Sequence, residues 1–154
     1  MTQTPPISVL VVDDHDLLRE GVSTVLSAFE DVDVIGEAST GESAIELVAD
    51  LKPDVVVIDL VMPGLGGVET IRRLREASKG LGIVALSSFS EGDRVREARE
   101  AGANGYMVKS VDADSLARAV RSAMAGQGAF SPQVTEALTA RPAPSAEVLA
   151  SLTA

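Results

Sequence analysis

Residues Val55-Val56-Val57-Ile58-Asp59 join the most hydrophobic run of the chain to a carboxylate. A continuous apolar run of this kind is typical of a strand that is covered on both faces of a parallel sheet. Three other short apolar runs also end at polar residues: Ile7–Val12 at Asp13 and Asp14, Ile83–Leu86 at Ser87, and Tyr106–Val108 at Lys109. If these runs are neighbouring parallel strands, their polar ends lie along one edge of one sheet, where ligands of open α/β sheets bind.

Segments with helical spacing alternate with the strand-like runs as far as about residue 125. The expected strands are Ile7–Val12, Val32–Ile35, Val55–Ile58, Ile83–Leu86 and Gly105–Val108. The expected helices carry apolar positions from Leu17 to Phe29, from Ala44 to Leu51 and from Val68 to Leu74, and then span Gly92–Ala101 and Asp112–Ala125. Five such β-α units favour an α/β fold whose parallel sheet has helices on both faces.

Local signals mark where some of these helices begin, end and pack. Ser39 and Glu42 match a capping box at the start of the second helix, and Gly102 suits the end of the fourth. The fourth helix has only Val95 and Ala98 on its inner face, so we expect it to be held weakly. The fifth helix is expected to turn four residues inward: Leu116, Ala117, Val120 and Met124.

The composition restricts the classes of function. The chain has 154 residues and a formal net charge of -10, which disfavours direct contact with nucleic acid. It has no cysteine for disulfides or thiolate metal sites, and the lone His15 cannot build an imidazole metal cluster. The amino terminus lacks the features of a signal peptide, and no apolar run approaches the roughly 20 residues that span a bilayer. We therefore expect a cytoplasmic protein without membrane contact.

The composition changes near residue 126, which predicts two parts. Residues 1–126 form the expected folded domain, and residues 127–154 form a tail. Within the tail, Ser131-Pro132 suits a helix start, and Arg141–Ser145 reads as a linker because its two prolines favour an extended chain.

The polar ends of the strands share one chemistry. Carboxylates about 4 Å apart repel by roughly 4 kcal/mol per pair at an effective dielectric near 20, so three of them require a compensating cation. Mg²⁺ prefers hard oxygen ligands and is often held by carboxylates together with phosphate oxygens. Asp59 is the best candidate for an aspartyl-phosphate nucleophile because it ends the central strand. Lys109 and Ser87 could contact a phosphoryl oxygen.

Each of these residues alone has a simpler interpretation. Acidic residues after strands are often solvated turn residues, a lysine is usually a surface residue, and one serine indicates almost nothing. His15 reads as a polar residue at a helix start, and Tyr106 could be ordinary strand packing. The functional interpretation depends on the coincidence that the Asp13-Asp14 pair, Asp59, Ser87 and Lys109 all come directly after predicted strands.

The chain resembles the receiver domain of bacterial response regulators over about residues 7–125. The motifs that carry the resemblance are Val11–His15, Asp59–Gly64, Ala85–Ser88 and Gly105–Lys109. The resemblance implies a doubly wound, five-stranded parallel sheet of order 2-1-3-4-5, the flavodoxin/CheY-like fold. It implies Asp59 as the phosphoacceptor, and Mg²⁺ held by Asp13, Asp14, Asp59 and the Val61 carbonyl. Ser87 and Lys109 would contact the phosphoryl group, and Tyr106 would be the aromatic partner of the Ser87 switch.

Finer features resemble the NarL/LuxR type, and more weakly its LiaR/VraR subgroup: Asp14-His15, Gly36–Ala38, Ala101–Tyr106 and Ser131-Pro132. The resemblance implies a response regulator of a two-component system, a switch and not an enzyme. A sensor histidine kinase would phosphorylate it, and phosphorylation would control homodimer formation and transcription. DNA would be bound only by a helix-turn-helix domain that follows the linker, and Leu152-Thr153-Ala154 stands where that domain would begin, as in a truncated chain.

Two rival classes stay open at this point. The first is a small phosphohydrolase with an aspartyl nucleophile, suggested by Asp14-x-Asp16 after an apolar strand. No Gly-Thr pair or cap insertion follows, and Asp59 would have no role. The second is a receiver-like interaction module that is never phosphorylated, which the intact acidic set disfavours. A third possibility, flavin binding, is disfavoured because the sequence has no phosphate-cradling loop after the first strand.

Overall fold

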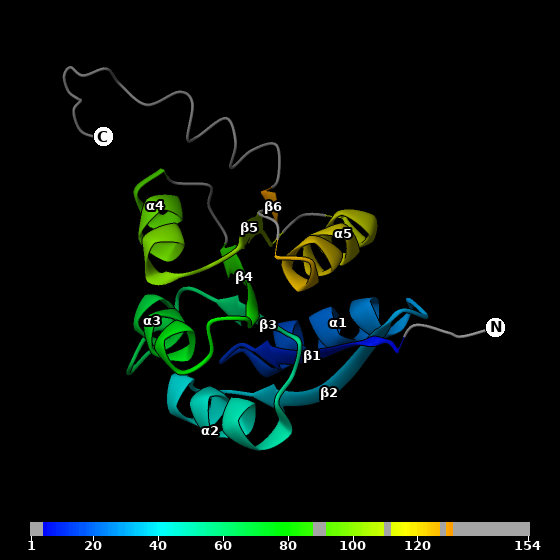
Figure 1. The fold of residues 1–154 in the computed structure, drawn as a ribbon, viewed down its shortest axis with the longest axis horizontal. Helices are drawn as coiled ribbons and strands as arrows, with labels where there is room; N and C mark the ends of the chain where they lie inside the picture. The colour runs from blue at the N-terminus through cyan, green and yellow to red at the C-terminus, as the bar shows by residue number, and fades with distance from the viewer. Residues whose placement is uncertain (1–4, 88–91, 110–111, 127–128, 131–154) are drawn as a thin grey trace.

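The computed structural model describes residues 5–87, 92–109, 112–126 and 129–130. Their strands form one parallel sheet in the order β2-β1-β3-β4-β5-β6 (Figure 1). The strands are β1 (Ile7–Val12), β2 (Val32–Ala38), β3 (Val55–Asp59), β4 (Gly82–Ser87), β5 (Gly105–Val108) and β6 (Ala129–Phe130). The predicted doubly wound fold and the order 2-1-3-4-5 of the first five strands are confirmed.

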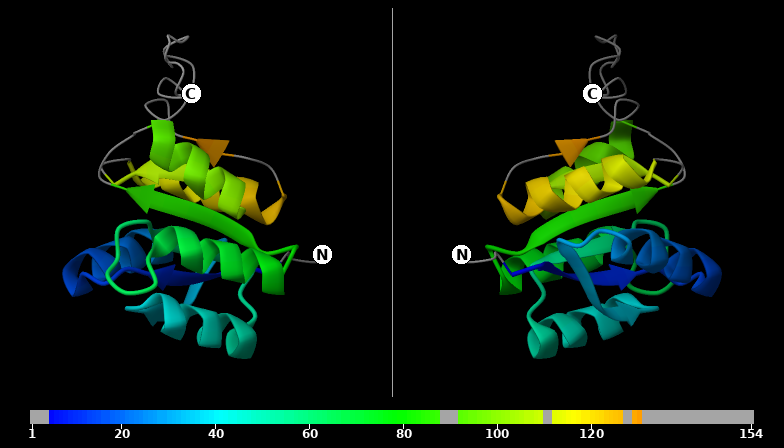
Figure 2. Two further views of the ribbon diagram at one scale, coloured as in Figure 1. Left: turned by 90° about the vertical axis from the view of Figure 1, so that its left-hand side faces the viewer. Right: turned by 90° about the vertical axis from the view of Figure 1, so that its right-hand side faces the viewer.

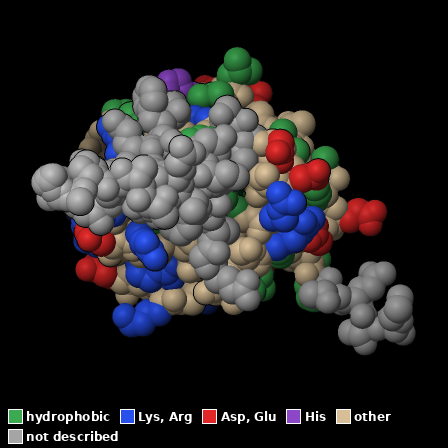
Figure 3. Space-filling model, turned by 90° about the horizontal axis from the view of Figure 1, so that it is seen from above, with side chains coloured by type: hydrophobic (Ala, Val, Ile, Leu, Met, Phe, Trp, Pro, Cys, Tyr) green, Lys and Arg blue, Asp and Glu red, His purple; other side chains and the backbone are tan. Residues whose placement is uncertain are grey.

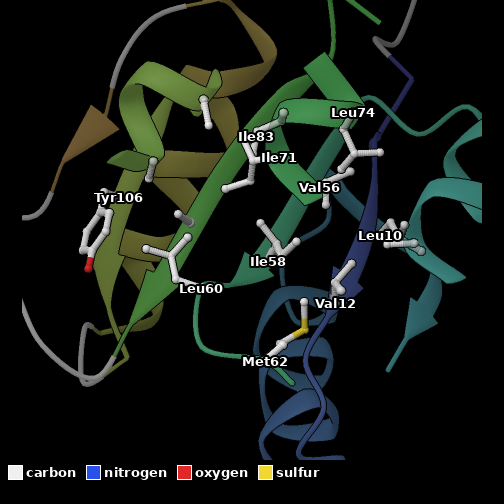
Figure 4. Packing of buried hydrophobic residues seen from close by; sticks show 14 of the residues in the cluster. Leu10, Val12, Val56, Ile58, Leu60, Met62, Ile71, Leu74, Ile83 and Tyr106 are labelled. Atoms are coloured by element: carbon white, nitrogen blue, oxygen red, sulfur yellow. The ribbon is translucent and has the colours of Figure 1, made fainter. Parts of the chain in front are cut away.

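Helices cover both faces of the sheet, so its central strands are buried on both sides (Figures 1 and 2). The helices are α1 (Asp16–Ser27), α2 (Gly41–Leu51), α3 (Gly67–Ala77), α4 (Gly92–Ala101) and α5 (Ala113–Met124). Val55 and Val57 of β3 pack in the layer below α1 and α5, while Val56 and Ile58 pack in the layer below α2, α3 and α4 (Figure 4). This alternation explains why the β3 run has no polar residue before Asp59.

Two strands depart from the sequence prediction. β2 continues three residues beyond Ile35. The register shifts between Val9 and Leu10, which pair with Val34 and Gly36, so the strand passes over Ile35 and keeps pairing with β1 as far as Ala38. β6 was not predicted, and it pairs with β5 through Gly105–Ala129 and Tyr106–Phe130. Two residues are too few to show a period, so this edge strand could not be recognised from its pattern.

The start of α2 also differs from the prediction. The capping box at Ser39 and Glu42 is wrong, because the cap is Thr40, whose Oγ1 accepts a hydrogen bond from the Ser43 N–H at 3.0 Å. The helix therefore begins at Gly41. A Cβ at Gly41 would lie 2.1 Å from the Thr70 hydroxyl of α3, so the close packing of the two helices leaves no room for a side chain at this position.

The apolar residues of α1 and α5 are only partly covered by the sheet. Leu17 is 82% exposed, although Leu26 on the same helix is fully buried. Met124 is 48% exposed, so the prediction that it turns inward is wrong. Its neighbour Ala123 already abuts Gly82, the first residue of β4, so Met124 lies past the end of the sheet.

The carboxyl end of α4 is tied to α3 and to β4. Gly102 follows the helix with φ +126°, and its N–H bonds to the Ala98 carbonyl, as predicted for a terminating glycine. Arg75 of α3 donates to the Gly102 carbonyl (2.7 Å) and to the Asn104 side chain (2.9 Å). Val95 and Ala98 are fully buried, as expected from the sequence.

The predicted tail helix at Ser131-Pro132 and the linker at Arg141–Ser145 lie outside the described residues. Within the described ranges, no helix has both the length and the apolar character needed to cross a membrane.

Candidate phosphoryl-acceptor site

The predicted site residues converge at the carboxyl edge of the sheet. Asp13 directly follows β1, Asp59 ends β3, Ser87 ends β4, and Lys109 directly follows β5. Backbone pairing continues beyond the strand ends, since the Asp13 N–H bonds to Ala38 and the Lys109 N–H bonds to Ser87. The sheet therefore fixes the backbone of these residues relative to one another, which is the arrangement that the sequence predicted.

Lys109 lies between two buried carboxylates. Its Nζ is 3.0 Å from Oδ2 of Asp59 and 3.6 Å from Oδ2 of Asp13, and these two aspartates are 1% and 2% exposed. One ammonium near two buried carboxylates leaves the centre with excess negative charge. Such a centre attracts a further cation.

Asp59 is held in an environment that disfavours its charged form. Burial raises the pKa of the Asp59 carboxyl above its ordinary value, and the Asp13 carboxylate raises it further. The Lys109 ammonium and the Val61 N–H, which donates to Oδ1 at 3.1 Å, oppose this increase of the pKa. Because Val61 holds Oδ1, the other oxygen, Oδ2, is the one that faces Lys109.

Asp14 and His15 complete the acidic cluster. Ligand atoms of Asp13, Asp14, His15 and Asp59 all lie within 4.8 Å of one another. The position of His15 in this cluster was not predicted from the sequence. The ring Nδ1 of His15 lies 3.3 Å from Oδ1 of Asp14, and the backbone N–H of His15 donates to Oδ1 of Asp13 at 2.9 Å. A polar residue two positions after an aspartate in a tight turn is the signal that could have suggested this contact.

The carboxylates fit a divalent metal ion. Oδ1 of Asp14 is buried and accepts no hydrogen bond from the described part of the chain, whereas the buried Oδ2 of Asp59 has the Lys109 ammonium as its partner. Buried carboxylate oxygens without such partners are costly, and a cation with oxygen preference would relieve that cost. The cluster could therefore bind a metal through its aspartates.

Ser87 and Tyr106 are both fully buried next to the site. Tyr106 pairs in register with Ala85, two residues before Ser87, and belongs to the buried cluster that contains Val95 and Ala98 of α4 (Figure 4). The ring is thus packed between the sheet and α4. Its inward position is compatible with the predicted switch partnership, which stays a prediction.

A groove leads from α1 to the site. It encloses about 260 Å³, and its walls include Leu17, Leu18 and Val25 of α1 and Leu116 of α5. Asp13 and Lys109 also line it, so the groove joins an exposed apolar helix edge to the carboxylates.

Figure 3 shows the charges on one face of the molecule. Where the described residues are visible on this face, acidic and basic side chains are mixed, without the broad basic patch that nucleic-acid binding would need.

Comparison with known proteins identifies relatives of this chain. The response regulator receiver domain family matches residues 9–121. The nitrate/nitrite response regulator NarL of Escherichia coli K12 is 40% identical over 140 residues, which are 91% of this chain and 65% of NarL. The response regulator VraR of Staphylococcus epidermidis is 37% identical over 147 residues, which are 96% of this chain and 70% of VraR. The chain thus spans about two thirds of the length of these curated relatives.

A solved structure agrees with the sequence relatives. The crystal structure of a LuxR-family two-component response regulator from Aurantimonas sp. SI85-9A1 superposes with a TM-score of 0.84 and 32% identity, covering 88% of this chain and 96% of that one. The sequence match, the sheet order and the converging acidic site agree with one another. The chain belongs to the response regulator receiver domain family and is of the NarL/LuxR type.

Proposed function

We propose that this chain is a phosphorylation-controlled switch that accepts a phosphoryl group on Asp59. The observation that supports it best is the ion pair of a fully buried Asp59 with Lys109 at 3.0 Å, beside a second buried aspartate. A structural ion pair would not need the second carboxylate, which raises the pKa of Asp59. The phosphodonor would be the phosphohistidine of a sensor histidine kinase, consistent with the receiver family.

In the proposed reaction, a carboxylate oxygen of Asp59 attacks the phosphorus of the phosphohistidine. The new O–P bond forms an acyl phosphate as the N–P bond breaks, and the imidazole leaves with the electron pair and takes up a proton from water. Oδ2 is the attacking oxygen, because Oδ1 is held by the Val61 N–H. Lys109 then stabilises the negative charge that spreads over the phosphoryl oxygens, and the Ser87 hydroxyl donates a hydrogen bond to one of them.

We propose Mg²⁺ as the cation of this site. Asp13, Asp14 and Asp59 would hold it, and the Val61 carbonyl would be a further ligand. When bound, the ion neutralises charge on the carboxylates and on the phosphoryl oxygens. Oδ1 of Asp14 supports this assignment, because it is buried, accepts no hydrogen bond from the described residues and could bind a hard cation.

The partner protein would approach along α1. A phosphohistidine must reach Asp59, and the exposed Leu17 and Leu18 lie on the groove that leads to Asp13 and Lys109. Apolar contacts beside the site would hold the donor in line with Asp59. Ser87 and Tyr106 would then couple the acyl phosphate to α4, whose Val95 and Ala98 belong to the same buried cluster as Tyr106.

The expected output is homodimer formation and control of transcription. Residues 1–126 would be the receiver, and residues 127–154 would lead to a helix-turn-helix DNA-binding domain. This output is a prediction for the whole protein. Dimer formation is tested on this chain by light scattering before and after phosphorylation.

The experiment that tests the proposed function is measurement of the intact mass after incubation with Mg²⁺ and acetyl phosphate. We expect one phosphoryl adduct on the natural chain and none on Asp59→Asn. Absence of an adduct with any donor would favour the interaction module that is never phosphorylated. Steady turnover of a phosphomonoester would favour the aspartyl phosphohydrolase.

A further inference from the structure

The turn between β1 and α1 carries two of the carboxylates, Asp13 and Asp14. The helix cap of α1 is His15, which makes no capping hydrogen bond with its side chain. The turn is instead crossed by the side chain of Arg19, one helical turn into α1. This side chain is 15% exposed.

Arg19 joins three parts of the chain at this turn. Its Nη1 donates to the backbone carbonyl of Asp13 at 2.7 Å, and its Nη2 donates to Oδ1 of Asp16 at 2.7 Å. Its Nε donates to Oε1 of Glu37 in β2 at 3.0 Å. The planar guanidinium offers donors in fixed directions, so it sets the relative positions of all three acceptors.

The contact with the Asp13 carbonyl has a consequence for the metal site. This carbonyl belongs to the peptide plane that joins Asp13 to Asp14. Rotation of the plane changes the backbone angles on both sides of it and would move the Asp14 carboxylate. A guanidinium anchored on Glu37 and Asp16 prevents this rotation by holding the carbonyl from outside the site.

We propose that Arg19 is a positioning residue for the divalent cation: it holds the Asp13–Asp14 peptide so that both carboxylates face the site. This inference rests on the proposed function. Arg19 would not touch the ion itself. Residues that orient metal ligands in this way typically change metal affinity about 10-fold or more when they are replaced.

The sign of the effect separates positioning from simple electrostatics. Arg19→Met removes a positive charge near a cation site, and by charge alone Mg²⁺ should bind more tightly. Positioning predicts the opposite. We expect the Mg²⁺ dissociation constant of Arg19→Met, measured by calorimetry, to rise about 10-fold. A value equal to that of the natural chain, or a tighter one, would overturn the proposal.

Arg121→Met is the matched control. Arg121 also forms a two-armed ion pair, with Asp31 at 2.6 and 3.0 Å, but it lies on α5 near the amino edge of the sheet. The Arg121 side chain is 42% exposed and that of Arg19 is 15% exposed, so Arg19→Met should lower the melting temperature without Mg²⁺ more than Arg121→Met does. Only Arg19→Met should change the affinity for Mg²⁺.

Two further variants keep the outcome decisive. If circular dichroism shows that Arg19→Met does not fold, Arg19→Lys replaces it: it keeps the charge, and weaker Mg²⁺ binding supports the proposal while unchanged binding overturns it. Where Arg19→Met folds, the effect of Glu37→Gln is measured in two backgrounds. Glu37→Gln should weaken Mg²⁺ binding less in the Arg19→Met chain than in the natural chain. If the natural chain binds no Mg²⁺, the proposed function fails as well. If the natural chain binds Mg²⁺ and the Arg19 variants bind it equally well, this inference alone fails.

Discussion

The two edges of the sheet differ in how far their carboxylates have hydrogen-bond partners. At the amino edge, Oδ2 of Asp54 accepts hydrogen bonds from the N–H and the hydroxyl of Ser8, at 3.0 and 3.1 Å, and Ser8 accepts the Asp54 N–H in return. At the carboxyl edge, Asp14 keeps a buried oxygen without a hydrogen-bond partner in the described chain, and Asp59 is buried beside Asp13.

This difference separates structure from function within one fold. The Ser8–Asp54 pair is complete and has no need of a ligand. The carboxyl edge holds excess negative charge that the folded chain alone does not neutralise, and such local conflicts are expected at functional sites. The comparison can be tested by asking which substitutions at each edge destabilise the chain and which stabilise it.

The largest effect on stability is expected from Lys109→Met. It would leave buried Asp59 and Asp13 without the ammonium that lies 3.0 and 3.6 Å from them, and breaking a buried pair costs about 3 kcal/mol of unfolding free energy. Urea unfolding at neutral pH without divalent ions measures this change. The exposed Lys79→Met is the control and should change stability by less than about 0.5 kcal/mol. Equal stability of the two variants would show that Lys109 does not compensate the cluster.

A smaller loss is expected at the amino edge. Asp54→Ala removes two hydrogen bonds from Ser8 and should lower the unfolding free energy by about 2 kcal/mol. The affinity for Mg²⁺ should not change, because the two edges lie at opposite ends of the strands. A change in Mg²⁺ binding of this variant would contradict the separation of the two edges.

Replacement of the acceptor should have the opposite sign. Because the folded state raises the pKa of the Asp59 carboxyl, the charged form costs stability at neutral pH. Asp59→Asn should therefore raise the unfolding free energy by about 1 kcal/mol near pH 7 in the absence of Mg²⁺. The gain should disappear as the pH falls through the folded pKa toward the unfolded value of 3.8, where Asp59 is protonated in both states.

Urea titrations of both chains at several pH values measure this gain. Mg²⁺ should reduce or reverse it, since the ion stabilises only the chain that keeps the carboxylate. A variant that is less stable than the natural chain at neutral pH would show that the Asp59 charge is fully compensated.

Much of this arrangement follows from the sequence because strand ends are easy to locate. Val55–Ile58 is too short and too apolar for a surface element, so Asp59 must stand at its end. The same reasoning placed Asp13, Ser87 and Lys109, whose backbone positions the parallel sheet then fixes. Sheet topology carries this information over long sequence separations.

The remaining features depend on geometry that has no sequence period. The contacts of His15 and Arg19 arise from the path of one turn, and β6 is too short to recognise. The exposure of Leu17 and Met124 depends on where the sheet stops, although both residues fit an apolar helical stripe. The α2 cap lies at Thr40, one residue after the predicted Ser39, and the next residue, Gly41, packs closely against Thr70 of α3.

The most direct test of the central claim is to locate the phosphoryl group. Borohydride reduces an aspartyl acyl phosphate to homoserine, which peptide mass spectrometry identifies by its position. After phosphorylation with acetyl phosphate and Mg²⁺, followed by reduction, we expect homoserine at position 59 and at no other aspartate. Homoserine at position 13 or 14, or none on a chain that carries the adduct, would contradict it.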